Sequence, residues 1–294
     1  MSSTATPRPA PTGHGPVLEI EATADGFAVP EPDPRPAGPV VFRVSTPDED
    51  GHKWGVFALR GTSSLESFLE DLVRSFSWDP AVKAEGSAGV NRQGRLLGGV
   101  NVYAEYPPHE FRAVLTEGTY YFLDYDDVVR PCLADRVRAL RVTGRADTDP
   151  APAGGVDAVI EAVGEGAGER YEMPDELPCR GRALLRNHND HPQEAVFGRL
   201  LPGTTDEELV AWMEAYKSGG KPDKDVFTGS PSGFMPVSGG EQAVIGYDLP
   251  PGPYAVFSFS RNPVTGAPGA FGGMRKIVTL RQGPGPLTGR TPSA

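Results

Sequence analysis

Hydrophobic positions follow the same order twice along the chain. Each block opens with an alternation of apolar and polar residues, at residues 17–22 and again at 156–161. Side chains of a β-strand point alternately to its two faces, so this period of two predicts a half-buried strand. Two further strands are predicted in each block, at residues 39–44 and 52–59 in the first and at 183–187 and 193–200 in the second. The chain therefore contains an internal repeat.

After the third strand of each block, the pattern changes to the period of a helix. Apolar side chains recur at the i, i+3, i+4, i+7 spacing over residues 65–76 and 209–216. Each helix also has a start signal, a hydroxyl residue followed three positions later by glutamate, which is the spacing of a capping box. These pairs are Ser63 with Glu66 and Thr205 with Glu208. We expect one short amphipathic helix per block, lying on the core.

Each block ends with a glycine-rich segment in which no element is predicted, then a hairpin and a last strand. The predicted hairpins cover residues 110–123 and 242–257, and the last strands cover residues 137–142 and 275–280. Many short strands separated by turn signals are typical of a sandwich. The predicted fold class is all-β with one short helix per domain, and each block forms its own sandwich.

Glycine and proline are unusually frequent, with 37 Gly and 31 Pro among 294 residues, about 23% against roughly 12% on average. Some of them mark turns at matching places in the two blocks, such as Gly118 and Gly252. Others lie in polar stretches without periodicity, which predict flexible segments. The predicted organisation is a disordered tail at 1–15, a first domain at 16–144, a linker at 145–155, a second domain at 156–282 and a disordered tail at 283–294.

Charge and hydropathy argue against several classes of protein. The chain has 28 Lys and Arg against 39 Asp and Glu, and this net charge of −11 disfavours binding to nucleic acid or to an anionic membrane. It has no apolar run of about 18 residues and no apolar core of a secretory signal near its start. Cys132 and Cys179 are too few for a disulfide scaffold or a cysteine-rich zinc site. We expect a cytoplasmic protein that binds neither nucleic acid nor membrane.

Three short motifs near the end of the second block resemble the cupredoxin family. The run Pro251-Gly252-Pro253-Tyr254 stands at the turn of the predicted hairpin, Gly266-Ala267-Pro268 follows it, and Gly272-Gly273-Met274 precedes the last strand. Together with the strand and helix before them, these motifs are similar to the closing part of a cupredoxin domain. The resemblance extends over nearly all of both blocks and implies two cupredoxin-like Greek-key β-sandwiches.

Copper-binding members of that family use two His, one Cys and usually a Met, because imidazole and thiolate favour copper. In the second block, the positions that the resemblance assigns to these ligands hold Gln193, Ser258, Gly269 and Met274. In the first block, His52 stands at the first ligand position, but Asp124 stands at the cysteine position. The resemblance therefore implies the fold without a blue-copper site, and we expect neither a metal nor another cofactor.

Two groups of histidines are candidates for other chemistry. His52, Asp124 and His109 would supply acid–base chemistry if the fold brought them together, since a carboxylate beside an imidazole orients its tautomer. His188 and His191 stand three residues apart in a predicted turn, where a metal-binding role competes with that of ordinary turn residues.

An acidic run, Asp124 to Asp127, follows a predicted strand of the first block. Its oxygen ligands suit Ca²⁺ or Mg²⁺, but the order of residues is not that of an EF-hand loop. A solvated surface loop is the plainer interpretation.

Three functions remain open at this point. The preferred hypothesis is a copper-free tandem sandwich that acts as a binding or structural module, with an unidentified protein or small molecule as partner. The alternative is a metal-independent enzyme that uses a pocket at the loop end of the first domain for acid–base or cyclisation chemistry, with His52 and Asp124 as its candidate catalytic pair. The third is a metal-handling protein that uses His52, His188, His191 and the Asp124 loop.

Overall fold

The computed structural model describes residues 15–29, 33–145, 155–217, 220 and 222–283. The expected tails and linker lie almost wholly outside the described residues. The N-terminal half contains β1 (Val17–Glu21), β2 (Arg35–Pro36), β3 (Gly38–Ser45), β4 (His52–Leu59), α1 (Leu65–Ser75), α2 (Pro80–Gln93), β5 (Gly94–Val102), β6 (His109–Leu115), β7 (Gly118–Asp124), η1 (Tyr125–Asp127), α3 (Leu133–Arg136) and β8 (Arg138–Thr143).

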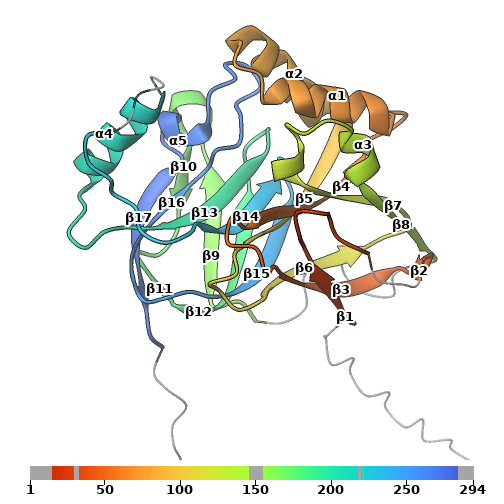
Figure 1. Ribbon diagram of the computed structural model, residues 1–294, viewed down its shortest axis with the longest axis horizontal. Coiled ribbons are helices and arrows are strands. Elements are labelled where there is room, and N and C mark those ends of the chain that lie inside the picture. Colours follow the sequence, from red (N-terminus) through yellow and green to blue (C-terminus); the bar gives the residue numbers. More distant parts are fainter. Residues whose placement is uncertain (1–14, 30–32, 146–154, 218–219, 221, 284–294) are drawn as a thin grey trace, which may run out of the picture.

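The C-terminal half contains β9 (Ala158–Val163), η2 (Gly166–Gly168), β10 (Arg170–Glu172), β11 (Glu176–Pro178), β12 (Arg180–Asn187), β13 (Gln193–Arg199), α4 (Asp206–Lys217), β14 (Ser232–Val237), β15 (Gln242–Asp248), β16 (Gly252–Phe257), α5 (Gly269–Gly272) and β17 (Arg275–Arg281). Among the described residues, the strands form two sheets that run through both halves (Figure 1). One has seven strands in the order β1-β3-β6-β15-β12-β9-β10, and the other has ten in the order β11-β17-β16-β13-β14-β5-β4-β7-β8-β2.

The two halves are joined by strand pairing and not only by the chain between them. In the seven-stranded sheet β6 pairs antiparallel with β15, placing Phe111 opposite Ile245. In the ten-stranded sheet β5 pairs antiparallel with β14, placing Val100 opposite Phe234. We call this second pairing the seam. In this sheet β4 lies next to β5 and β13 lies next to β14, so these two corresponding strands flank the seam.

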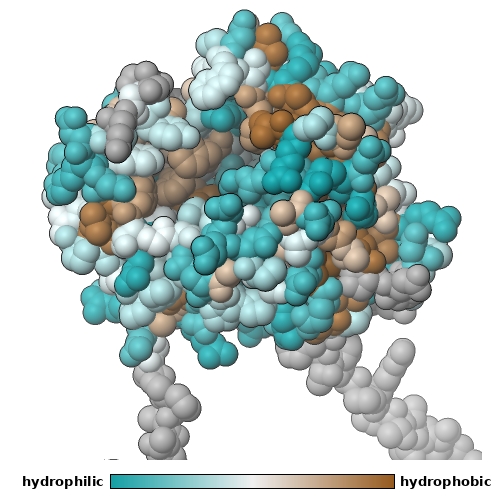
Figure 2. All heavy atoms as spheres, viewed as in Figure 1, coloured by the Kyte–Doolittle hydropathy of each residue, from teal (hydrophilic) through white to brown (hydrophobic). Residues whose placement is uncertain are grey.

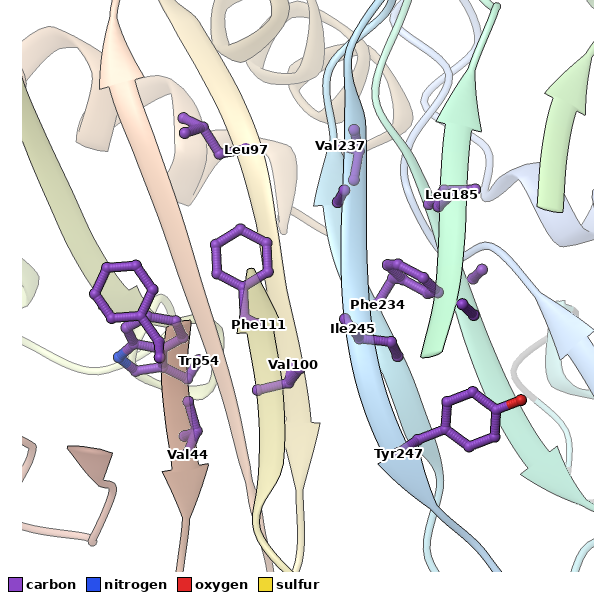
Figure 3. Close-up of a cluster of buried hydrophobic side chains, with 14 of the residues drawn as sticks. Val44, Trp54, Leu97, Val100, Phe111, Leu185, Phe234, Val237, Ile245 and Tyr247 are labelled. Carbon is purple, nitrogen blue, oxygen red and sulfur yellow. The ribbon is translucent and has the colours of Figure 1, made fainter. Parts of the chain in front are cut away.

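Both sheets enclose one hydrophobic core that continues from one half into the other (Figure 3). Trp54 and Phe111 fill it in the N-terminal half, and Phe234 and Ile245 fill it across the seam, each with at most 1% of its surface exposed. The alternation that predicted the strands therefore points one face of each strand into this core. The expected all-β class with two cupredoxin-like sandwiches is confirmed.

The predicted hairpins are wrong in one respect. β6 and β7 are consecutive but lie in different sheets, as do β15 and β16, so each connection crosses from sheet to sheet. A glycine at the crossing makes the bend possible, because Gly252 has φ 143°, a region that disfavours other residues. The Tyr254 hydroxyl donates a hydrogen bond to the Pro250 carbonyl at 2.9 Å, which stabilises the bend between β15 and β16.

Both predicted helices form, as α1 and α4, and the described residues contain three further α-helices and two 3-10 helices. Thr205 and Glu208 make the expected capping box, with reciprocal bonds of 3.1 and 3.2 Å. In α1 the cap lies one residue later than expected, because Ser64, not Ser63, accepts the Ser67 N–H. Of the described helices, none is long and apolar enough to cross a membrane.

No periodic pattern predicts α2, because that helix has no apolar stripe. It packs against α1 through small residues: a Cβ added to Gly86 would meet the Ser75 backbone at 2.4 Å. Together α1 and α2 cover the outer face of the ten-stranded sheet in the N-terminal half, and α4 covers it in the C-terminal half (Figure 1).

Candidate functional site

A cavity of about 360 Å³ lies over the seam, on the outer face of the ten-stranded sheet. Helices α1 and α2 line one side, and α4 with residues 257–261 lines the other. Figure 2 shows this face hollowed between α4 and α2, with tan to brown surface inside the hollow. The apolar part of the wall includes Leu72, Val90, Leu96, Val196, Met235 and Phe257. We call this space the seam cavity. Its volume is at the lower end of the range found for small-molecule pockets.

Strand register explains which polar side chains reach the cavity. Lys53 on β4 lies opposite Asn101 on β5, Asn101 lies opposite Gly233 on β14, and Gly233 lies opposite Val196 on β13. Residues opposite one another share a face of the sheet. Glu194 is two residues from Val196 and therefore joins this row on the outer face.

Glu194 is the unusual member of the row. Its carboxyl lines the seam cavity and accepts a hydrogen bond from the Ser260 hydroxyl at 3.1 Å. Burial raises the pKa of this carboxyl to about 7, although Ser260, Arg261 and Lys53 favour the ionised form. A carboxyl that changes protonation near neutral pH is suited to bind a ligand or to exchange a proton with it.

Two cationic side chains share the cavity with Glu194. The Lys53 ammonium pairs with Asp126, which also lines the cavity. Arg261 differs, because no hydrogen bond or ion pair joins its guanidinium to another described residue. Burial lowers the Arg261 pKa against the opposing effect of Glu194, but a guanidinium remains charged in proteins.

The structure brings the predicted pair His52 and Asp124 together, beside the cavity but not on its wall. Asp124 Oδ2 lies 2.5 Å from His52 Nδ1, and Asp48 Oδ2 lies 2.9 Å from His52 Nε2. Burial alone would lower the His52 pKa, but the hydrogen bonds to Asp124 and Asp48 outweigh it and raise the pKa. The other Asp124 oxygen accepts the backbone N–H groups of Lys53 and Asp126. Both ring nitrogens are occupied, so a substrate would have to displace Asp48 to reach the imidazole.

His109 does not join that pair. Its Nε2 lies 2.6 Å from the Ser232 hydroxyl and its Nδ1 lies 2.9 Å from the Pro107 carbonyl, in a fully buried position. Burial lowers the His109 pKa, so the ring is neutral at physiological pH. Through its hydrogen bond with Ser232, His109 connects β6 of one sheet with β14 of the other, which is a structural role.

His188 and His191 also have separate partners. His188 pairs with Glu161 on the exposed surface. His191 is buried, with Nδ1 2.8 Å from Asp190 and Nε2 3.0 Å from Gln193 Nε2 and 3.4 Å from Glu169. In the described part of the chain, no group of three or more His, Cys, Asp or Glu residues has the arrangement of a metal site.

The four degenerate copper positions of the second half do converge, at a loop end that is filled with side chains. Gln193, Ser258 and Met274 have no exposed surface. A Cβ on Gly269 would lie 3.2 Å from Met274 and 3.3 Å from the Gln193 Oε1 atom. That oxygen has no hydrogen-bond partner among the described residues. The side chains of Gln193 and Met274 thus fill the space between these four positions.

The sequence-based reasoning missed Glu194 and Arg261. Glu194 reads as the polar member of an alternating strand, which normally faces water. The signal that could have identified it is its neighbourhood: the same segment is followed by an amphipathic helix that must lie on the sheet. A charged residue under such a helix is buried. Arg261 follows the second predicted hairpin, and no pattern in the sequence around it indicates a functional role.

The sequence matches no protein-family model and no curated protein. The solved structures that are similar in fold include the following three. Auracyanin A, a blue copper protein from Chloroflexus aurantiacus, is 15% identical over 44% of this chain and 100% of its own, with a TM-score of 0.30. Reduced auracyanin from Roseiflexus castenholzii is 17% identical over 42% and 94%, with a TM-score of 0.26. A blue copper oxidase from Nitrosomonas europaea is 14% identical over 90% and 85%, with a TM-score of 0.22.

Proposed function

We propose that the chain is a copper-free tandem sandwich whose function is to bind a small molecule in the seam cavity. The observation that carries this proposal is a cavity of about 360 Å³ with mainly apolar walls and a half-buried carboxyl, that of Glu194, on one of them. Pockets of this composition, with few and convergent polar groups, are typical of ligand sites. A cytoplasmic location is part of the proposal, favoured by the exposed free thiol of Cys132, since a reducing compartment preserves such thiols.

The absence of copper is likewise a proposal, supported by the side chains at the degenerate positions. Gln193, Ser258 and Gly269 offer neither imidazole nor thiolate, the ligands that give copper its affinity and its colour in such sites. The loop end they form is filled, whereas the seam cavity is open. We therefore place binding between the halves and not at the loop ends.

The test is to fill the cavity and measure the binding of a neutral apolar probe. Ser87 lies on α2, lines the cavity and bonds only to the Lys83 carbonyl of its own helix. Ser87→Phe projects a ring into the cavity, and Ala81→Phe adds the same ring on the exposed side of α2 as a matched control.

The measured quantity is the fluorescence of N-phenyl-1-naphthylamine titrated with the full chain. We expect the wild type and Ala81→Phe to bind the probe with equal affinity, and Ser87→Phe to bind it at least about tenfold more weakly, because the ring takes the place of the ligand. Equal binding by a folded Ser87→Phe variant would show that the probe does not enter the cavity and would refute the proposal.

One observation favours a second function, acid–base catalysis, at the same cavity. A Glu194 pKa of about 7 matches the pH at which a general acid or base is most effective. In that case Glu194→Gln would abolish turnover of a bound substrate while leaving its binding largely intact. The pair His52 and Asp124 stays a prediction for such chemistry, with Asp48 as the group that must move.

A further inference from the structure

We propose that the ligand of the seam cavity has an apolar body and a single carboxylate, which binds between Arg261 and Glu194. This inference rests on the proposed function and specifies the chemical class of the ligand. It comes from the balance of charges and hydrogen bonds on the cavity wall.

The first argument is that one cation in the cavity has no hydrogen-bonded or ion-paired partner among the described residues. Lys53 and Asp126 neutralise each other as a pair. Arg261 has no partner within hydrogen-bonding or ion-pairing distance among the described residues, and it lies in a half-buried position. A guanidinium presents parallel N–H groups that match the two oxygens of a carboxylate, so a ligand carboxylate would satisfy it better than a hydroxyl or an amine.

The second argument is that a buried amide on the same wall lacks a partner. Asn101 is 1% exposed and lines the cavity. Its Oδ1 is buried without a hydrogen-bond partner. Among the described residues none accepts a hydrogen bond from its side-chain nitrogen. Buried polar groups are normally hydrogen-bonded, so the amide N–H group is available to a ligand carboxylate, while the Oδ1 atom calls for a donor.

Glu194 contributes in its protonated form. The groups that face its carboxyl are Ser260 and Arg261 after β16, Lys53 on β4, Tyr125 at η1 and Tyr171 on β10. When protonated, the carboxyl donates a hydrogen bond to a ligand oxygen. When ionised, it repels the ligand carboxylate. Binding is therefore coupled to the uptake of one proton.

The apolar body of the ligand would lie against an aromatic wall. Phe257 and Phe259 make an edge-to-face contact with centroids 5.1 Å apart, and Tyr216 lies 6.2 Å from Phe259. All three line the cavity near Arg261. A flat or unbranched hydrocarbon fits such a wall, so aromatic and fatty carboxylic acids are the class indicated.

The experiment compares three probes that share one apolar body, by isothermal titration calorimetry of the full chain. They are 2-naphthoate, 2-naphthylmethanol and 2-naphthylmethylamine, which carry a negative, no and a positive charge. At pH 6 we expect naphthoate to bind about tenfold more tightly than the alcohol, as one charge-assisted bond provides. The amine should bind most weakly.

The variants separate this inference from the proposed function. Arg261→Gln should lose the preference for naphthoate over the alcohol, and Arg261→Lys should retain part of that preference. Arg180→Gln, at an exposed arginine on β12, is the control and should change nothing. Folding of each variant is checked by circular dichroism.

The pH dependence of naphthoate binding is a second, independent test of the inference. With a Glu194 pKa of about 7, the protonated fraction falls about tenfold from pH 6 to pH 8, and naphthoate affinity should fall by about the same factor. In Glu194→Gln this fall should be absent.

Two results would overturn the inference. If the alcohol binds and naphthoate binds no better, the carboxylate class is wrong while the proposed binding function stands. If none of the three probes binds at millimolar concentration, both the proposed function and this inference fail.

Discussion

The wild type is expected to become less stable as the pH rises, because the Glu194 carboxyl ionises. Replacing Glu194 with glutamine should remove this loss of stability. The pKa of this carboxyl is about 7 in the folded protein, against an ordinary value of 4.5. An acid with a raised pKa binds more protons folded than unfolded, so the free energy of unfolding falls as the pH rises between these two values. At about 1.4 kcal/mol per pH unit, the wild type should lose about 2–3 kcal/mol between pH 5 and pH 8 through this group.

The Glu194→Gln substitution separates the effect of the carboxylate charge from the effect of the side-chain shape. It keeps the size of the side chain and an oxygen that accepts the Ser260 hydroxyl hydrogen bond, but it cannot ionise. We therefore expect Glu194→Gln to be about 1 kcal/mol more stable than the wild type at pH 5 and about 3 kcal/mol more stable at pH 8.

The assay is urea unfolding of both proteins between pH 5 and pH 8, followed by tryptophan fluorescence, to which the fully buried Trp54 contributes. Taking the difference between the two proteins at each pH cancels the titration of all other groups. Glu70→Gln, at an exposed position on α1, is the control and should give a difference that does not vary with pH. A difference for Glu194→Gln that is equally flat would show that the cavity does not desolvate this carboxyl.

Three further outcomes are expected. Ser64→Ala should destabilise the protein by about 1 kcal/mol through loss of the α1 cap, whereas Ser63→Ala should change stability by less than about 0.5 kcal/mol; thermal unfolding distinguishes them. In an NMR titration of the histidines, His52 should titrate above its ordinary pKa and His109 below it. The stability that His52 contributes is present at low pH and is lost as the pH rises through its raised pKa, whereas that of Asp124, whose pKa is lowered, is lost as the pH falls. After chelator treatment, elemental analysis should find no stoichiometric copper, and added Cu²⁺ should give no intense visible band, because no thiolate stands beside paired imidazoles.

The sequence predicted the strands that face the core because one side of each is buried and the other is not. Such alternation is a direct consequence of burial, as at β1 and β9, where buried and more exposed positions alternate. β5 was missed because both of its faces are buried, one by the core and one by the helices, and its middle contains the glycines Gly98 and Gly99. A strand with no polar face and no β-branched run has no period to detect.

The joining of the halves was not predictable from the repeat. The repeat indicates two similar sandwiches, but it does not say whether their sheets meet edge to edge. The pairing of Phe234 with Val100 is a contact between residues far apart in sequence, with no local signature. Because the seam cavity depends on that pairing, the site could not be found before the halves were placed together. Its residues, Glu194 and Lys53, were visible only as polar positions of ordinary strands.

The repeat itself explains why the site lies at the seam. Lys53 follows the first residue of β4, and Glu194 follows the first residue of β13, so the two occupy corresponding positions in the two halves. Pairing through β5 and β14 turns these positions toward one cavity, with opposite charges. A chain that needed only packing there would gain about 3 kcal/mol at pH 8 from a neutral side chain in place of Glu194. Ionisable groups kept at such a cost are characteristic of functional sites. The filled loop end of the second half and the costly carboxyl between the halves therefore both support the proposal that this protein functions at the junction of the two sandwiches.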